Sequence, residues 1–142
     1  MTSMQPSNRV PRIDTALAIL RIVVGVVFIA HGAQKLFVWG HPGVVGAFTK
    51  MGIPVPALGG WVVAIVEFFG GIALVIGAAA SLAAALIAID MLGAMVFVHL
   101  KNGFVLPMGA EFAFTLLGAA VTIMIAGPGA WSVDGALRRK QP

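Results

Sequence analysis

The sequence predicts an all-α integral membrane protein, a bundle of four helices that cross the bilayer. Hydrophobic residues make up 60% of the 142 residues and charged residues only 10%, whereas a soluble domain carries roughly 25% charged residues. The mean hydropathy is +1.03, and the apolar runs are long enough for spans of about 20 residues each. One compact membrane domain, residues 13–135, with no soluble domain beside it, is therefore predicted.

The net charge and the cysteine content limit which partners this protein can bind and which redox or metal chemistry it can carry out. The net charge is +4, and basic residues gather near the two ends, which suits anionic lipid headgroups and topology signals rather than nucleic acid. Membrane lipids are thus predicted partners and nucleic acid is not. The chain has no cysteine, which excludes disulfides, thiol redox relays and cysteine-ligated metal. We predict no metal site, and any redox role needs a bound cofactor or a partner.

The first span is predicted at 14–38, after a polar segment, 1–12, that we expect to be a disordered cytoplasmic tail. A cleaved signal peptide is the alternative, but the apolar stretch is too long and His31-Gly32-Ala33 is a poor cleavage site. Residues 40–58 are rich in glycine and proline. They predict a loop with a short surface helix around 44–51.

Two further spans are predicted at 58–77 and 81–100. The apolar stretch from Leu58 to Leu100 is too long for one span, and the turn-capable segment from Gly77 to Ser81 lies midway. A hydropathy window would instead mark the uncharged run 68–89, but that choice leaves two fragments too short to cross. A fourth span is predicted at 108–127, ended by Gly127-Pro128-Gly129. A basic cytoplasmic tail, 136–142, follows.

The distribution of basic residues predicts the orientation. With four spans both termini lie on one side, and that side carries the basic residues Arg9, Arg12, Arg138, Arg139 and Lys140. The positive-inside rule puts this side in the cytoplasm. The loops at 40–58 and 101–107 then face outward.

Ionisable residues inside the apolar runs predict a polar interior, because a charge near the bilayer centre costs about 3 kcal/mol or more. Arg21, Gly25 and Lys35 share one stripe of the first span, and Glu67 is followed on its face by glycines. Glu67 and Asp90 both fall about nine residues into their spans, near the midplane. We therefore predict a buried ion pair between Arg21 and Glu67 or Asp90. A proton or substrate site is the alternative reading.

A second polar cluster is predicted toward the outer face. His31, Lys35, His99 and Glu111 come from three different spans and lie at similar depth. A cationic rim with two imidazoles suits an anionic or carbonyl-bearing ligand, such as a quinone head, whereas a polar plug that holds the bundle in register is the structural alternative. Two histidines are a weak signal for haem, which we do not predict. Lys35 with Trp39 is most simply an interfacial anchor.

An ordered series of short motifs resembles the DoxX family over residues 14–135. It consists of Arg21-Ile22, Phe28 with His31-Gly32 and Lys35, Gly52-Ile53-Pro54-Val55-Pro56, Glu67-Phe68-Phe69-Gly70-Gly71, Gly77, His99-Leu100-Lys101-Asn102-Gly103-Phe104, Glu111 and Gly127-Pro128-Gly129-Ala130-Trp131-Ser132-Val133-Asp134. The resemblance implies a four-span protein of the bacterial cytoplasmic membrane. Members of that family have been linked to quinone-coupled sulfur oxidation and to oxidoreductase assemblies that handle oxidative stress. No catalytic residue set is shared across it.

Three functions are compatible with these observations. The first is a membrane subunit that docks or supports a redox complex, with redox-enzyme subunits as partners and a quinone as ligand. The second is a small proton-coupled transporter that uses Glu67 and Asp90 at the midplane. The third is an enzyme acting on a quinone or lipid headgroup, with His31, His99 and Glu111 as acid–base groups. The sequence leaves the enzyme question and a homo-oligomer open.

Overall fold

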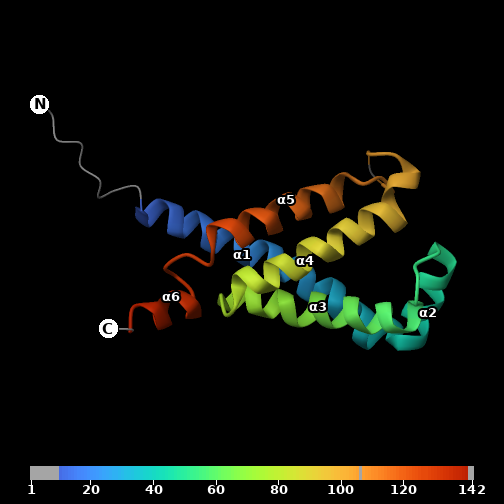
Figure 1. Cartoon of the computed structure of the whole chain (residues 1–142), viewed down its shortest axis with the longest axis horizontal. Coiled ribbons are helices and arrows are strands. Elements are labelled where there is room, and N and C mark those ends of the chain that lie inside the picture. The colour runs from blue at the N-terminus through green and yellow to red at the C-terminus, as the bar shows by residue number, and fades with distance from the viewer. Residues whose placement is uncertain (1–9, 106, 141–142) are drawn as a thin grey trace, which may run out of the picture.

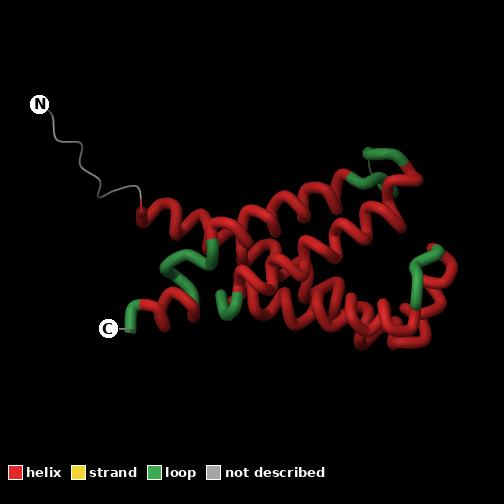
Figure 2. Tube along the Cα trace, viewed as in Figure 1, coloured by secondary structure: helices red, strands yellow, loops and turns green. Residues whose placement is uncertain are grey.

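The computed structural model describes residues 10–105 and 107–140, and the described residues contain helices and turns but no strand. Figures 1 and 2 show the arrangement. The helices are α1 (Val10–Ala33), the π-helical η1 (Gln34–Trp39), α2 (Gly40–Met51), α3 (Pro56–Ile76), α4 (Ala80–Ala94), the π-helical η2 (Met95–His99), the 3₁₀ turn η3 (Leu100–Asn102), α5 (Glu111–Ala126) and α6 (Val133–Arg138). The chain is the all-α membrane bundle that the sequence predicts.

Three helical stretches are long and apolar enough to cross a membrane: Pro11–Met51, Pro56–Ile76 and Ala80–Asn102. The fourth, α5, is apolar but has 16 residues, a length of about 24 Å. It is shorter than the predicted 108–127 because residues 107–110 form turns and a bend rather than helix. Most of the predicted tail 1–12 lies outside the described residues, and α1 already begins at Val10.

The four main helices form two antiparallel pairs, α1 with α3 and α4 with α5. The pairs lie close together at the end that holds α6 and separate toward the end that holds α2 (Figure 1). Phe28, Leu74, Ile87 and Ile123 are the largest fully buried apolar side chains of the core between them. The outer surface is also apolar, with side chains that are more than half exposed: Ile19, Val23, Phe69, Leu82, Ile89 and Ile125. Such a surface suits lipid rather than water.

Glycines set the close approach of α1 and α3. A Cβ at Gly71 would lie 2.7 Å from the carbonyl oxygen of Gly25, and a Cβ at Gly25 would lie 2.7 Å from the carbonyl oxygen of Gly71. A Cβ at Gly32 would likewise collide with the backbone of Phe68. Because backbone cannot move aside as a side chain can, only glycine allows the two helices to approach this closely. Gly25 and Gly71 therefore fix the register of the pair.

That register contradicts the predicted ion pair between Arg21 and Glu67 or Asp90. Because α1 and α3 are antiparallel, Arg21, one turn before Gly25, lies beside Val75, one turn after Gly71, and far along α3 from Glu67. Its Nη1 donates to the carbonyl oxygens of Leu74 at 2.5 Å and Val75 at 2.8 Å, and its Nη2 donates to that of Trp131 at 2.7 Å.

The reason for this placement lies in the end of α3. The last carbonyls of a helix have no partner within it, and the helix dipole favours a cation there. The prediction of an ion pair between Arg21 and Glu67 or Asp90 was therefore wrong, because the guanidinium caps the end of α3, where the nearby carboxylate is that of Asp134.

The segment after α5, which includes α6, packs against the end of the bundle where α3 ends and α4 begins. The Asp134 carboxylate accepts hydrogen bonds from the first amides of α4, Ala79 N at 2.9 Å and Ala80 N at 3.1 Å. Near the start of α1, Asp14 accepts one from Ala130 N at 2.8 Å. Asp14, Asp134 and Arg21 thus hold this segment against α1, α4 and the end of α3.

Candidate functional site

A cavity of about 490 Å³ lies where the two helix pairs separate. Helices α1, α3, α4 and α5 form its sides, and α2 with the following residue Ile53 covers part of it. Its walls are largely apolar and include Phe28, Phe48, Val63, Met91, Phe97 and Leu116. Pockets that bind small molecules have this character, apolar walls with a few placed polar groups.

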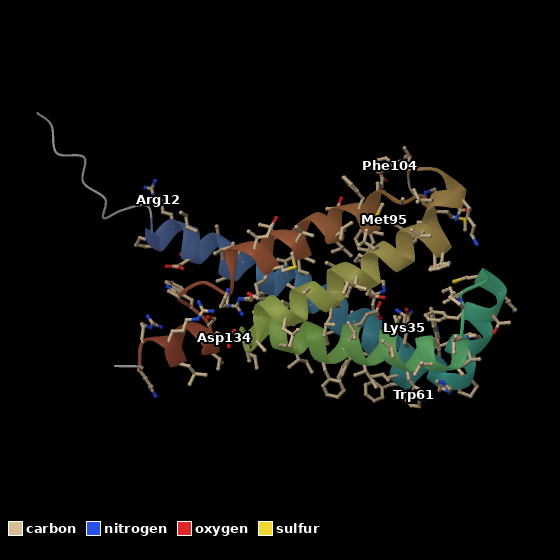
Figure 3. The ribbon with its side chains drawn as sticks, in the orientation of Figure 1. Arg12, Lys35, Trp61, Met95, Phe104 and Asp134 are labelled. Carbon is tan, nitrogen blue, oxygen red and sulfur yellow. The ribbon has the colours of Figure 1, made fainter. Side chains whose placement is uncertain are left out.

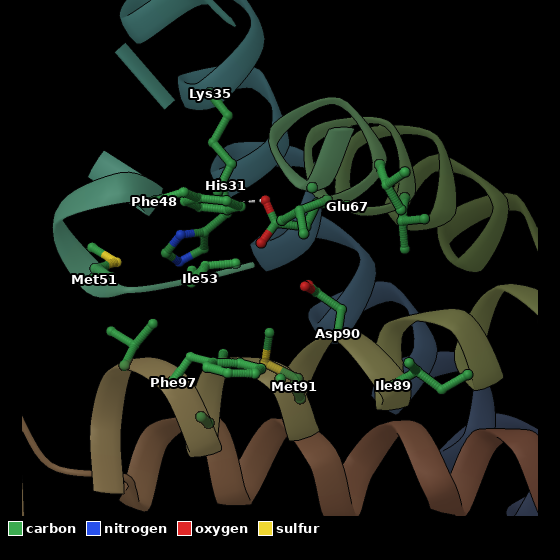
Figure 4. Close-up of a pocket in the computed structure, with 18 of the residues that line it drawn as sticks. His31, Lys35, Phe48, Met51, Ile53, Glu67, Ile89, Asp90, Met91 and Phe97 are labelled. Carbon is green, nitrogen blue, oxygen red and sulfur yellow. Dashed lines mark hydrogen bonds and ion pairs between the residues drawn. The ribbon is translucent and has the colours of Figure 1, made fainter. Parts of the chain in front are cut away.

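Three ionisable side chains meet on one wall of the cavity, as Figure 4 shows. Lys35 Nζ lies 2.6 Å from Glu67 Oε2, and the two side chains are only 12% and 6% exposed. Asp90, from α4, faces this ion pair and interacts electrostatically with both members. Its Oδ2 is buried and has no hydrogen-bond partner among the described residues.

This cluster contains one ammonium group and two carboxyl groups, so its positive and negative charges do not cancel when both carboxyls are ionised. A buried pair of opposite charges compensates its own desolvation, whereas a further buried carboxylate does not. Asp90 therefore needs a proton, which it can share with Glu67, or a further hydrogen-bond donor, for which Oδ2 is the available acceptor. A ligand in the cavity is one source of such a donor.

Two π-helical segments, η1 and η2, border the cavity from opposite sides. Lys35 and Trp39 belong to η1, and Phe97 and His99 belong to η2, and all four line the cavity. π-Helical turns occur mostly as short interruptions of α-helices and are frequent at functional sites. Both interruptions here fall where their helices border the cavity.

The cover of the cavity depends on a turn at Gly40. This residue has φ +63°, which favours glycine, and α2 then packs back against α3. The His41 ring stacks on that of Trp61 with centroids 4.7 Å apart, and its Nε2 lies 2.8 Å from the Ala57 carbonyl oxygen. The short surface helix expected around 44–51 is thus α2, and it presents Phe48 to the cavity.

The structure brings three residues of the predicted outer cluster to this cavity: His31, Lys35 and His99 line it. The His31 ring lies 6.3 Å from that of Phe112, and His99 Nδ1 lies 3.3 Å from the Met108 carbonyl oxygen. The fourth, Glu111, is not among the lining residues, although its neighbour Phe112 is. Glu111 instead begins α5, where its amide donates to the Phe104 carbonyl oxygen at 2.8 Å.

Two expectations about depth need correction. Lys35 is not an exposed interfacial anchor, because its side chain points inward to Glu67. The midplane carboxyls and the outer histidines are not two separate layers either, since Glu67, Asp90, His31 and His99 all line one cavity. Sequence reasoning missed the Lys35–Glu67 pair. The register set by Gly25 and Gly71 was the signal that could have found it.

No group of three or more His, Asp or Glu side chains suited to a metal ion occurs in residues 10–105 and 107–140. In Figure 3, the labelled side chain of Lys35 lies within the bundle, and that of Asp134 lies at the end that holds α6. The chemistry available at the cavity is therefore that of an ammonium group, two carboxyls and two imidazoles. These groups can donate hydrogen bonds to a polar head and hold a proton beside it.

Comparison with known proteins gives one family and two relatives. The family model of DoxX matches residues 16–100. The chain is 32% identical over 110 residues to "Putative oxidoreductase CatD" of Bacillus subtilis, covering 77% of each chain. It is 29% identical over 132 residues to "Uncharacterized membrane protein Rv3486" of Mycobacterium tuberculosis, covering 85% of this chain and 80% of the relative. No solved structure matches it significantly. The matched segment includes every ionisable residue that lines the cavity.

Proposed function

This chain belongs to the DoxX family, and on that premise we propose that it is a membrane component of an oxidoreductase that binds a quinone-type lipid in its cavity. The observation that carries the proposal is the buried Lys35–Glu67–Asp90 cluster in the wall of an otherwise apolar cavity. The name of the Bacillus subtilis relative, a putative oxidoreductase, supports a redox role. The proposal places the protein in the bacterial cytoplasmic membrane.

The residues of the cavity fit a quinone head. Its ring and tail would pack on apolar walls, while its carbonyl oxygens need hydrogen-bond donors. Lys35 supplies an ammonium donor, and His31 and His99 supply ring nitrogens elsewhere in the lining of the same cavity. A hydroxyl of the reduced form could donate to Asp90 Oδ2, the buried oxygen that has no partner among the described residues.

A bound quinone supplies two-electron, two-proton redox chemistry, and a partner subunit supplies the electrons. The chain has no cysteine and therefore no thiol redox group of its own. This fits a role in which the electrons come from a partner subunit. Its own residues orient the head and hold the proton. Asp90, beside Glu67 and Lys35, is positioned to keep a proton in a site shielded from water.

A binding measurement tests the proposal. Trp39 lines the cavity, so replacing Trp61 and Trp131 by Phe leaves a single fluorescent reporter there. In lipid nanodiscs a benzoquinone with one isoprenoid unit should quench this fluorescence saturably. Lys35→Met combined with Glu67→Gln removes both members of the ion pair together, so that neither is left without its partner, while the Asp90 carboxyl stays in place. Because a hydrogen bond from a charged group is worth about 1.5–3 kcal/mol, affinity should fall roughly 10- to 100-fold.

Lys50→Met is the matched control, because Lys50 is exposed and does not line the cavity. Its affinity should equal that of the unaltered protein. Equal binding by the control and the double variant would show that the quinone does not use this site, and no saturable quenching in the parent protein would refute the proposed function.

Proton-coupled transport is the second candidate, favoured by the unpartnered Asp90 oxygen beside a second carboxyl. Ionisable residues within membrane bundles often mark ion pathways. A carrier predicts a proton flux in proteoliposomes that Asp90→Asn abolishes. A quinone-binding subunit predicts no such flux, with Asp90→Asn affecting quinone binding instead.

Topology is tested separately. The start of α1 and α6 lie at the same end of the bundle, opposite α2 (Figure 1), as an even number of crossings requires. Reporter fusions after Ser81 and after Gln141 should give a cytoplasmic signal, and a fusion within residues 43–50 an external one. A cytoplasmic signal from residues 43–50 would refute the orientation.

A further inference from the structure

We infer that the hydrocarbon tail of the bound lipid leaves the cavity sideways between α3 and α4 and lies in a groove on the membrane-facing surface. This inference rests on the proposed function and adds to it the shape of the ligand and its route. We call this surface the α3–α4 groove; it is bounded by residues of the ranges 65–73 on α3 and 79–86 on α4.

The α3–α4 groove is a separate hollow that meets the cavity. Its volume is about 250 Å³, and no ionisable side chain lines it. Val66 from α3 and Leu86 from α4 line both the groove and the cavity. The two hollows therefore share a boundary, and a chain that passes between these side chains goes from one to the other.

The cavity is bordered on this side by exposed apolar side chains. Val62, Leu86 and Ile89 line it and are 50%, 43% and 67% exposed. In a bilayer, exposed apolar side chains of this kind meet lipid. The inferred route passes between them, so that a lipid-soluble molecule enters without crossing water.

Small residues form the floor of the groove. Gly70 and Ala83 lie on facing helices within it, and a Cβ added at Gly70 would already lie 3.3 Å from Ile87 Cδ1. From Val66 to Ala73 the groove follows α3 for seven residues, about 10 Å at the helical rise. This space is apolar and extends along the helix, which suits a hydrocarbon chain and not a headgroup.

The two hollows together define the ligand class. The cavity offers charged and hydrogen-bonding groups, whereas the groove offers only apolar contact. The occupant is therefore an amphiphile whose compact polar head lies against Lys35 and whose tail extends at least about 10 Å toward the α3–α4 turn. Bulk acyl chains can cover the groove but cannot satisfy the cluster.

The test compares tails on one headgroup. In the single-Trp39 protein in nanodiscs, affinity is measured for a benzoquinone with one isoprenoid unit and for the same head with four. Ala73→Phe fills the groove at its far end. It should weaken binding of the long-tailed quinone about tenfold, equivalent to losing the burial of roughly two methylene groups, and leave the short-tailed quinone unchanged. Unchanged short-tail binding also shows that the variant is folded.

Two control variants define the outcomes. Ala30→Phe adds the same ring to an exposed position of α1 outside both hollows and should change neither affinity. Met51→Phe obstructs the alternative route, between α2 and η2, where the lining residues Met51 and Phe97 are 36% and 40% exposed. If Met51→Phe and not Ala73→Phe discriminates between the tails, or if neither does, the inferred route is wrong while quinone binding stands. If neither quinone binds, the proposed function fails and the inference fails with it.

Discussion

Arg21 joins three parts of the chain, and its replacement tests how one end of the bundle is held together. Its side chain is buried, with 2% exposure, and donates to the carbonyl oxygens of Leu74, Val75 and Trp131. Arg21→Met keeps a similar length and removes all three hydrogen bonds. It leaves the last turn of α3 without its cap and removes one contact of the segment that carries Trp131, which Asp14 and Asp134 still hold.

The expected loss can be estimated from these bonds. Hydrogen bonds from charged groups contribute about 1.5–3 kcal/mol each, but two of the three come from Nη1, so they do not add fully. Burial of a guanidinium group is costly in itself, and Met avoids that cost. We expect a net loss of about 3 kcal/mol in the free energy of unfolding. On the scale of soluble domains of this size, that is a fall in Tm of roughly 10 °C.

The assay is thermal unfolding in mild detergent, followed by circular dichroism. Arg12→Met is the matched control, because Arg12 is exposed on the same helix, and its Tm should stay within about 2 °C of the parent. A double-mutant cycle with Glu67→Gln adds a sharper test. The structure predicts additive effects, since Arg21 and Glu67 share no partner. A Tm for Arg21→Met equal to that of the control, or strong coupling to Glu67, would refute this account.

Three further predictions concern other contacts, measured by the same unfolding assay. Lys35→Met should be destabilising by roughly 3 kcal/mol because it strands Glu67, and adding Glu67→Gln should restore much of that loss; additive losses would contradict the pair. Gly71→Ala should cost about 1–3 kcal/mol because its Cβ meets backbone of α1. Gly118→Ala, whose Cβ meets nothing within 4 Å, should be neutral or stabilising, and equal effects would argue against the close helix contact. Asp134→Ala should cost about 1–2 kcal/mol through loss of the α4 cap, and an unchanged Tm would show that the cap contributes nothing.

Composition and hydropathy were sufficient to predict the fold class. Few charges and long apolar runs permit only a membrane bundle, because backbone polar groups in lipid must be satisfied within helices. The predicted ends of the second and fourth spans were also close to the observed helix ends, since Gly77 and Gly127 end α3 and α5. The short α5 was not foreseen, because Pro107 and Gly109 lie in a loop whose extent depends on contacts with Phe104.

The sequence alone also determined that Arg21, Glu67 and Asp90 must lie inside, because their charges are too costly to leave in lipid. It could not determine their partners. Periodicity gives the face of each helix but not how far one helix slides along another, and a shift of one turn exchanges one partner for the next. Only the packed structure, through backbone contact at Gly25 and Gly71, decided that Lys35 meets Glu67 while Arg21 caps the end of α3.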